Sequence, residues 1–343
     1  MPWLLWVLGA MLVLLAAFFL AVYIKIFSYF TTRGRAPTNF YEYFLSQFPS
    51  LTARPFTCPS GGETLSCIQL QYSESPKALI VMVHGLGWNM EHYFPQAEYM
   101  ARAGYSIILF DGVGIGRSSG AQLRGMPQHV LDVSAVLDYV ESTPDLAALP
   151  LMLYGHSWGG YAANSVSCKK RYPLCAIASV SAYIEPVGTM TAALRRRFSL
   201  LGLIVSLPLA RYQRKTFGKA GDGYMSTKGL SLADCPVLVM HSEGDEDLPF
   251  QDSFAAMEKA LDSKSKIRFL AFEGKNHNLG IPGDVNKQRR ELQRKIRKIS
   301  DPVQKEKLLQ ELWALQMIID ESILEILVSF YDESLKNEST AAL

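Results

Sequence analysis

The stretch LMLYGHSWGG, residues 151–160, decides the fold of this 343-residue chain. Its first six residues form a largely apolar run of strand length, which is typical of a strand buried on both faces of a parallel sheet. Gly155, Ser157 and Gly159 then give the pattern G-x-S-x-G, and a helical pattern follows over residues 158–171. A sharp turn between strand and helix strains the serine backbone and projects its hydroxyl from the sheet edge. The stretch therefore predicts that Ser157 is a nucleophile.

Similar apolar runs lie on both sides of this stretch, and helical patterns separate most of them. The predicted strands are residues 63–72 at an edge, then 78–84, 105–110, 151–156, 175–180, 236–241 and 267–272. The predicted helices are residues 91–103, 129–141, 158–171 and 253–261, with a final helix over 311–336. Strands that alternate with helices imply a mostly parallel, doubly wound sheet. The fold class is therefore α/β.

Two segments interrupt the alternation. Residues 184–230 lie between two predicted strands and are too long for one crossover, so we expect a cap inserted over the carboxyl edge of the sheet. Residues 284–310 form a second, charged helical insertion before the final helix. Both segments lie where loops over a site belong.

Composition excludes several classes of protein. Hydrophobic residues make up 49% of the chain, which excludes a disordered protein. The net charge of +2 is too small to create a positive electrostatic field that would hold nucleic acid. The glycines of residues 112–120 do not match a dinucleotide-binding fingerprint, because its third glycine falls on Arg117 or Ser119. The sequence has neither a Walker loop nor an HExxH helix, so it implies no metal and no organic cofactor.

The amino-terminal segment is uncharged over residues 2–24. As a helix, residues 3–24 would span ~33 Å, enough for a hydrocarbon core of ~30 Å. We interpret residues 1–30 as a transmembrane anchor, 31–62 as a juxtamembrane linker and 63–343 as the catalytic domain. A cleaved signal peptide is the alternative, but it would have a basic residue before a shorter apolar run and a small-residue cleavage site after it.

The side of the membrane is predicted from charge and from cysteine content. Lys25, Arg33 and Arg35 follow the apolar run, so the positive-inside rule places the catalytic domain in the cytoplasm. The five cysteines include no CxxC pair, which agrees with reduced thiols. Cys58 and Cys67 would close a loop only if the domain faced an oxidising space.

Chain order selects the partners of Ser157. A serine hydroxyl needs a neutral imidazole as base and a carboxylate that orients the imidazole, and this fold has them in the order serine, acid, histidine. Only His241 and His277 follow Ser157, and His241 precedes the acidic cluster, so His277 is the predicted base. In that cluster Asp245 is the preferred acid, with Asp247 as the alternative.

Backbone N–H groups complete the predicted site. The segment VHGLG, residues 83–87, ends a strand where a flexible backbone can turn an N–H group toward the reacting carbonyl. The N–H groups of Leu86 and Trp158 are therefore the predicted oxyanion hole. His84 is interpreted as a residue that braces this loop.

These motifs together resemble the α/β-hydrolase superfamily, and most closely its monoacylglycerol-lipase-like and serine-aminopeptidase-like serine hydrolases. The similarity covers about residues 65–280. It is carried by GHSWGG around Ser157, VHGLG at 83–87, FDGVGIGRSSG at 110–120, the acid loop at Asp245 and the NHN loop at His277. The resemblance implies the α/β-hydrolase fold and a Ser157, Asp245, His277 triad, but it does not specify a substrate.

We therefore expect a membrane-anchored serine hydrolase that cleaves carboxylic esters, with lipid esters among the candidates. The alternative is a serine aminopeptidase-like peptidase, which needs a carboxylate or a carbonyl group to hold the free amino-terminus of a peptide, and Glu185 is a candidate for that group. A non-catalytic binding module on the same fold is a third hypothesis, which the complete set of triad residues disfavours.

Two further segments are candidates for membrane contact. The apolar run of residues 199–210 in the cap either lines an acyl pocket, dips into lipid or is buried. In the second insertion, Val285, Leu292, Ile296 and Ile299 fall on one helical face among many basic residues. This pattern is typical of a basic amphipathic helix that binds a lipid surface, and equally of a helix that packs its stripe on the catalytic domain.

Overall fold

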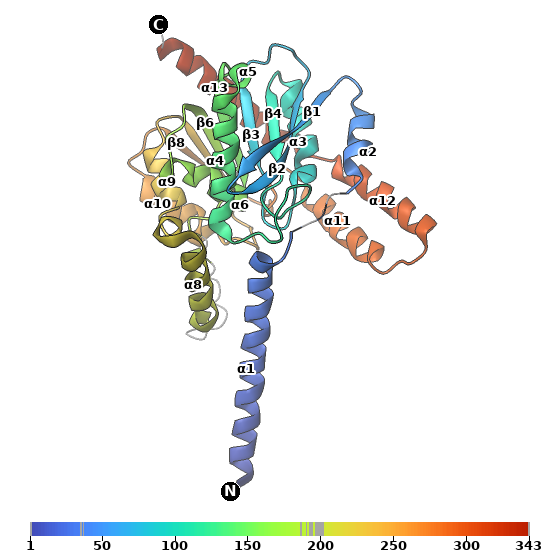
Figure 1. Ribbon diagram of the computed structural model, residues 1–343, viewed down its shortest axis with the longest axis vertical. Coiled ribbons are helices and arrows are strands. Elements are labelled where there is room, and N and C mark those ends of the chain that lie inside the picture. Colours follow the sequence, from blue (N-terminus) through green and yellow to red (C-terminus); the bar gives the residue numbers. More distant parts are fainter. Residues whose placement is uncertain are drawn as a thin grey trace.

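The computed structural model describes residues 2–34, 36, 38–185, 187–189, 191, 195 and 202–341. Within these residues an eight-stranded sheet forms the centre of the domain, in the order β1-β2-β4-β3-β5-β6-β7-β8 (Figure 1). β2 runs antiparallel to both of its neighbours, and the other pairs are parallel. The strands are β1 Thr52–Ser60, β2 Glu63–Gln71, β3 Leu79–Val83, β4 Ser106–Phe110, β5 Leu151–His156, β6 Leu174–Val180, β7 Val237–Ser242 and β8 Ile267–Phe272.

Helices cover both faces of the sheet. The α-helices are α1 Pro2–Thr31, α2 Phe40–Gln47, α3 Phe94–Arg102, α4 Met126–Ser142, α5 Pro144–Ala147, α6 Trp158–Ser165, α8 Gly202–Gly221, α9 Ser226–Leu232, α10 Phe254–Leu261, α11 Gly283–Ile296, α12 Pro302–Gln316 and α13 Glu321–Ala341. Short 3₁₀ turns are η1 Met90–Tyr93, η2 Val166–Cys168 and η4 Phe250–Asp252. Apolar residues of α4, α6 and α10 join the core on one face, and those of α2, α3 and α13 join the core on the other.

The continuous apolar runs build these two cores because side chains alternate between the faces of a strand. In β3, Leu79, Val81 and Val83 belong to one core, while Ile80 and Met82 belong to the other. All five residues are buried. A strand with both faces covered in this way has no polar alternation, and the sequence therefore predicted it as a buried parallel strand.

The sheet begins earlier in the chain than the sequence predicted. The segment 31–62, expected to be a linker, contains α2 and β1, so its assignment as a simple linker is wrong for residues 40–60. Among the described strands β1 pairs with β2 alone and is the edge strand, a place where the two prolines of TARPFTCPS are tolerated. The strand expected at the edge, β2, pairs on both sides and is not an edge strand. Phe40 and Phe44 of α2 are fully buried, and their ring centroids lie 6.4 and 5.1 Å from that of Phe94.

Two predicted helices end differently in the structure. The helix expected over 158–171 ends at Ser165, and the one expected over 311–336 is in fact α12 and α13 with a break between them. At that break the N–H of Asp320 donates to the carbonyl of Gly280 at 3.0 Å, and its carboxylate pairs with Lys275. The break thus follows from contacts with a distant loop, which helical periodicity does not reveal.

The long helix α1 extends away from the domain, and α8 projects from the same side (Figure 1). Residues Trp3–Lys25 are long and apolar enough to cross a membrane, and almost none of their surface is buried in the protein. The carboxyl end of α1 is bound to the domain, since the carbonyl of Phe30 accepts from the N–H of Arg124 at 2.9 Å. Phe27 also packs on Tyr212 of α8, with ring centroids 4.8 Å apart.

The cap expected over residues 184–230 includes α8 and α9. Part of the cap lies outside the described residues, including Arg196, Arg197 and the start of the apolar run 199–210. Arg35, one of the basic residues that follow the apolar amino-terminal run, also lies outside them. In the rest of the run, Leu209 is buried and Leu207 is 65% exposed.

The second insertion packs on the protein. Val285 and Leu292 of α11 are buried, while Ile296 and Ile299 are partly buried. The apolar stripe is therefore covered, and the structure favours the packing interpretation over a free lipid-binding face. Arg289, one of the basic residues of this helix, is buried as well, so it does not contribute to an exposed basic surface.

Candidate active site

Ser157 stands at the turn between β5 and α6 in a strained conformation. Its φ is 56° and its ψ is −115°, a region that side chains other than glycine seldom adopt. The flanking glycines are required by close packing, because a Cβ on Gly155 would lie 2.3 Å from the carbonyl oxygen of Gly159. A Cβ on Gly159 would lie 2.1 Å from that of Val83. The G-x-S-x-G spacing thus has a steric cause in the structure.

The structure brings Ser157, His277 and Asp245 into one hydrogen-bonded chain. His277 Nε2 lies 2.9 Å from Ser157 Oγ, and His277 Nδ1 lies 2.7 Å from Asp245 Oδ2. Both side chains that flank the imidazole come from loops at the carboxyl ends of parallel strands, the edge where ligands bind in open α/β sheets. Asp247, the alternative acid, is 57% exposed, and its carboxylate lies 3.8 Å from Arg290 instead.

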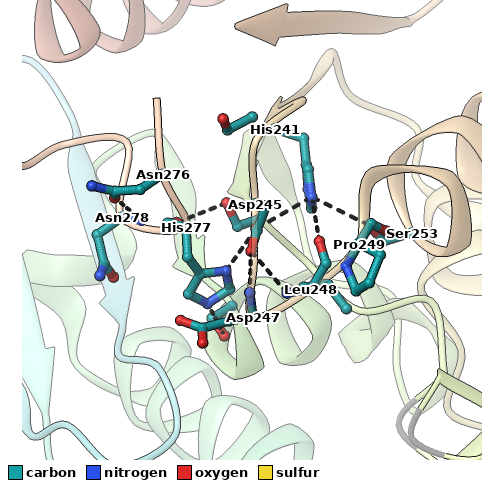
Figure 2. Close-up of polar contacts among 12 residues, drawn as sticks. His241, Asp245, Asp247, Leu248, Pro249, Ser253, Asn276, His277 and Asn278 are labelled. Atoms are coloured by element: carbon teal, nitrogen blue, oxygen red, sulfur yellow. Dashed lines mark hydrogen bonds and ion pairs between the residues drawn. The ribbon is translucent and has the colours of Figure 1, made fainter. Parts of the chain in front are cut away.

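The Asp245 carboxylate is held on all sides (Figure 2). Its Oδ1 accepts hydrogen bonds from the N–H groups of Asp247 and Leu248 at 2.9 and 2.8 Å. His241 Nε2 lies 3.3 Å from Oδ2 and donates to the carbonyl of Leu248 at 3.0 Å. Burial raises the pKa of the Asp245 carboxyl, but the hydrogen bond and charge of His277 and the Leu248 N–H outweigh it, so the pKa lies below its ordinary value.

His277 stands on a loop that is fastened at several points. The side chain of Asn276 accepts from the N–H of Asn278 at 2.8 Å, a local turn that Figure 2 shows beside the imidazole. The carbonyl of His277 accepts from the hydroxyl of Ser181 at 2.9 Å. Lys275, two residues earlier, forms the ion pair with Asp320 at the junction of α12 and α13. The carboxyl-terminal helices therefore help to position the base.

His156, next to the candidate nucleophile, links the base to the oxyanion loop. The N–H of Gly85 donates to the Tyr93 hydroxyl at 2.8 Å, and this hydroxyl lies 2.8 Å from His156 Nδ1. Since the hydroxyl oxygen accepts from Gly85, its proton is free to be donated to Nδ1. His156 Nε2 then carries the proton that binds the carbonyl of His277 at 3.1 Å. Burial, and to a smaller extent the nearby His277, lowers the pKa of His156 to about 3, so its ring is neutral.

Sequence reasoning missed this network and the role of His241. The G-x-S-x-G pattern leaves the residue at position 156 unspecified. Tyr93 is far from Ser157 in the chain, so the sequence gives no indication that the two lie close together. The histidine directly before the predicted nucleophile is the sequence feature that could have indicated a positioning role.

The predicted oxyanion donors lie at the same edge of the sheet. Leu86 and Trp158 contribute backbone N–H groups for which we find no acceptor among the residues that the structure describes. Their loop is braced by His84, which donates from Nδ1 to the carbonyl of Gly85 at 3.0 Å and accepts at Nε2 from the N–H of Gly112 at 3.1 Å. His84 therefore occupies the bracing position that the sequence suggested.

A cavity of about 480 Å³ opens at this site, a size typical of small-molecule pockets. Ser157, His277 and the loop that carries Leu86 form one wall of this cavity. Residues of α11 and the end of α12 form another wall. Its lining residues include Leu86, Trp88, His92, Ser157, Tyr183, His277, Asn286, Arg289, Arg290, Gln293 and Gln316. Across the described part of the chain, no group of three or more His, Cys, Asp or Glu side chains is arranged to hold a metal ion.

Comparison with known proteins identifies similar hydrolases and a structure of the same fold. Residues 74–217 match the family model described as serine aminopeptidase, S33. The uncharacterized protein YfhR of Salmonella typhi is 27% identical over 223 residues, which are 62% of this chain and 72% of that protein. Human monoglyceride lipase is 34% identical over 107 residues, 31% of this chain and 35% of that protein. The esterase Pf2001 of Pyrococcus furiosus has the same fold, with a TM-score of 0.55 and 16% identity over 72% of this chain and 90% of its own.

Proposed function

We propose that the chain, which belongs to the α/β-hydrolase superfamily and is a serine hydrolase, cleaves carboxylic esters through an acyl-enzyme on Ser157. The observation that carries this proposal is the hydrogen-bonded chain from Ser157 Oγ through His277 to Asp245. A serine hydroxyl 2.9 Å from an imidazole nitrogen has the arrangement that general-base activation requires.

In the proposed reaction, Ser157 Oγ attacks the ester carbonyl while His277 Nε2 takes the hydroxyl proton. Asp245 holds Nδ1–H and stabilises the imidazolium that forms. The N–H groups of Leu86 and Trp158 donate to the developing oxyanion, and each such donor contributes about 3–4 kcal/mol in known hydrolases. His277 returns the proton to the leaving alcohol, and water then releases the acyl group by the same steps.

Esters are favoured over peptides by the surroundings of Glu185. A peptidase of the aminopeptidase type would use this carboxylate to hold a free amino-terminus. In the structure the carboxylate instead accepts from the N–H groups of Val187 and Gly188 in its own turn, and it does not line the cavity. The name of one similar protein, a monoglyceride lipase, supports an ester substrate, whereas the matched family model is named for a serine aminopeptidase.

We also propose that α1 anchors the enzyme in a membrane, with the catalytic domain on the cytoplasmic side. Its apolar stretch, Trp3–Lys25, could equally serve as a signal sequence by length and composition. The anchor is supported by the packing of its carboxyl end, since Arg33 donates to the carbonyls of Gly116, Ser118 and Gly120. Membrane fractionation and the amino-terminal sequence of the mature protein distinguish an anchor from a cleaved signal sequence.

The enzymatic proposal is tested with the full chain in a neutral detergent. A fluorophosphonate probe should label the wild type and not Ser157→Ala. Hydrolysis of p-nitrophenyl esters of graded length is then compared with that of aminoacyl-nitroanilides. Ester turnover without anilide turnover is the expected result. Anilide turnover alone would favour the peptidase, and a folded protein that is not labelled would favour a binding module.

A further inference from the structure

The cavity at Ser157 has a buried cation in its wall. Arg289 of α11 is 8% exposed and lines this cavity. Its guanidinium reaches the end of α12, where Nε and Nη2 donate to the carbonyl of Leu315 at 3.1 and 2.7 Å and Nη2 donates to that of Ile318 at 3.1 Å. A cation at a helix carboxyl terminus is stabilised by the exposed carbonyls. These contacts hold the side chain in one orientation.

The charge of Arg289 is not neutralised by any carboxylate in the described part of the chain. All of its hydrogen bonds go to backbone carbonyls, and Nη1 has no acceptor among the described residues. Burial lowers the pKa of Arg289 to about 10, so the group is still a cation at neutral pH. A buried charge without a partner is costly, and an anion beside it removes that cost.

The rest of this wall is also suited to an anion. Arg290 and one carboxylate, Asp247, line the same cavity, and both side chains are more than half exposed, with their charged groups 3.8 Å apart. The two arginines therefore outnumber the single carboxylate of the lining. The side chains of Asn286, Gln293 and Gln316 add amide groups to the lining. The wall that faces the candidate nucleophile is therefore a polar surface with a net positive charge.

We propose that Arg289 binds an anionic group, a carboxylate or a phosphate, that the ester substrate carries. This inference rests on the proposed ester hydrolysis and specifies its substrate class. The hydrogen bonds of Nε and Nη2 are explained by capping of α12. Capping does not explain why Nη1 has no acceptor among the described residues or why Arg289 lines the cavity, whereas a bound anion explains both. Guanidinium groups bind carboxylates and phosphates through charge-assisted hydrogen bonds, which are stronger than neutral ones.

The test compares matched substrates in neutral detergent micelles, so that the surface charge is constant. One pair is a monoacylglycerol and the monoacylglycerol phosphate with the same acyl chain. The other pair is the p-nitrophenyl half ester of a dicarboxylic acid and the p-nitrophenyl ester of a neutral acid of equal length. The first pair places the anion on the alcohol side of the ester and the second places it on the acyl side.

In the wild type we expect kcat/KM to be higher for the anionic member of at least one pair. Arg289→Gln should lower that value about 10- to 100-fold more than the value for the neutral member, mainly through KM, as expected for a lost hydrogen bond to a charged group. Arg289→Lys should restore part of the preference. Arg294→Gln is the matched control, because this arginine is exposed on the same helix and does not line the cavity.

Equal losses for both members of each pair in Arg289→Gln would overturn the proposal, because they would indicate a purely structural cap. A wild type without preference for either anionic substrate would also overturn it.

A second measurement does not depend on variant folding or on ester turnover. Inorganic phosphate should slow fluorophosphonate labelling of the wild type more than sodium chloride of equal ionic strength, and equal effects of the two salts would contradict an anion site. If labelling proceeds but no ester of either pair is hydrolysed, the ester proposal fails, while the phosphate effect still decides the anion site.

Discussion

The substitution Asp245→Asn changes one atom at the centre of the site. The Oδ1 atom can still accept from Asp247 and Leu248, so the loop keeps both backbone hydrogen bonds. The atom that replaces Oδ2, 2.7 Å from His277 Nδ1, becomes a donor and no longer accepts the imidazole proton. His277 then favours the tautomer with its proton on Nε2, which cannot take the proton of Ser157.

The expected effect is a fall in kcat of about 10³- to 10⁴-fold, as in other triads whose acid is made neutral. At about 1.36 kcal/mol per tenfold, this is about 4–5.5 kcal/mol of transition-state stabilisation. Stability should fall by only about 1–3 kcal/mol, the cost of one unsatisfied buried polar contact. The loss of activity should thus be much larger than the loss of stability.

The assay is steady-state hydrolysis of a p-nitrophenyl ester, with chemical denaturation of the same samples. Asp247→Asn is the matched control, since this carboxylate is exposed and lies 3.8 Å from Arg290, whereas the carboxylate of Asp245 contacts His277 Nδ1. It should retain kcat within about twofold, as is usual for surface substitutions. An Asp245→Asn enzyme with near-normal kcat, or an Asp247→Asn enzyme with the large loss, would refute the assignment of the acid.

Three further outcomes follow from the packing around the site. Tyr93→Phe removes the hydroxyl between the Gly85 N–H and His156 Nδ1, so thermal denaturation should show a loss of about 1–3 kcal/mol, and unchanged stability would contradict the network. Gly159→Ala places a Cβ 2.1 Å from the carbonyl oxygen of Val83, so unfolding experiments should show a loss of at least about 1–3 kcal/mol, and wild-type stability would disprove the required close approach. The pKa of His156 is about 3 in the folded protein and about 6.5 in the unfolded chain. Below pH 6.5 the unfolded chain therefore binds a proton that the folded protein does not, and the free energy of unfolding falls with the pH, by about 2 kcal/mol at pH 5. Denaturation at pH 7 and pH 5 should show a smaller decline in His156→Gln than in the wild type, and equal declines would rule out this contribution.

Patterns within single segments predicted most of the sheet. Strands such as β3 and β5 are buried on both faces, so their apolar runs are visible in the sequence. β1 was missed because its prolines and its Arg54 are typical of a linker, and only its pairing with β2 makes it an edge strand. The break between α12 and α13 was missed because the Lys275 and Asp320 pair joins residues 45 apart in the chain.

The candidate site was predictable where chemistry and chain order restrict the choice. The turn motif identified Ser157, and only His277 satisfied the order of the triad. The choice between Asp245 and Asp247 depended on the path of a short loop, which only three-dimensional geometry reveals. Arg289 looked like one of many basic residues on α11, and its burial depends on contacts with α12 that periodicity does not encode.

An acyl-enzyme on Ser157 is detected most directly by its mass. The full chain is mixed with an ester substrate, quenched in acid within its steady state, digested and examined by mass spectrometry. We expect the peptide with Ser157 to carry the added mass of the acyl group, and Ser157→Ala to yield no acylated peptide. Ester turnover with an unmodified Ser157 peptide, or with the acyl group on another residue, would contradict an acyl-enzyme on Ser157.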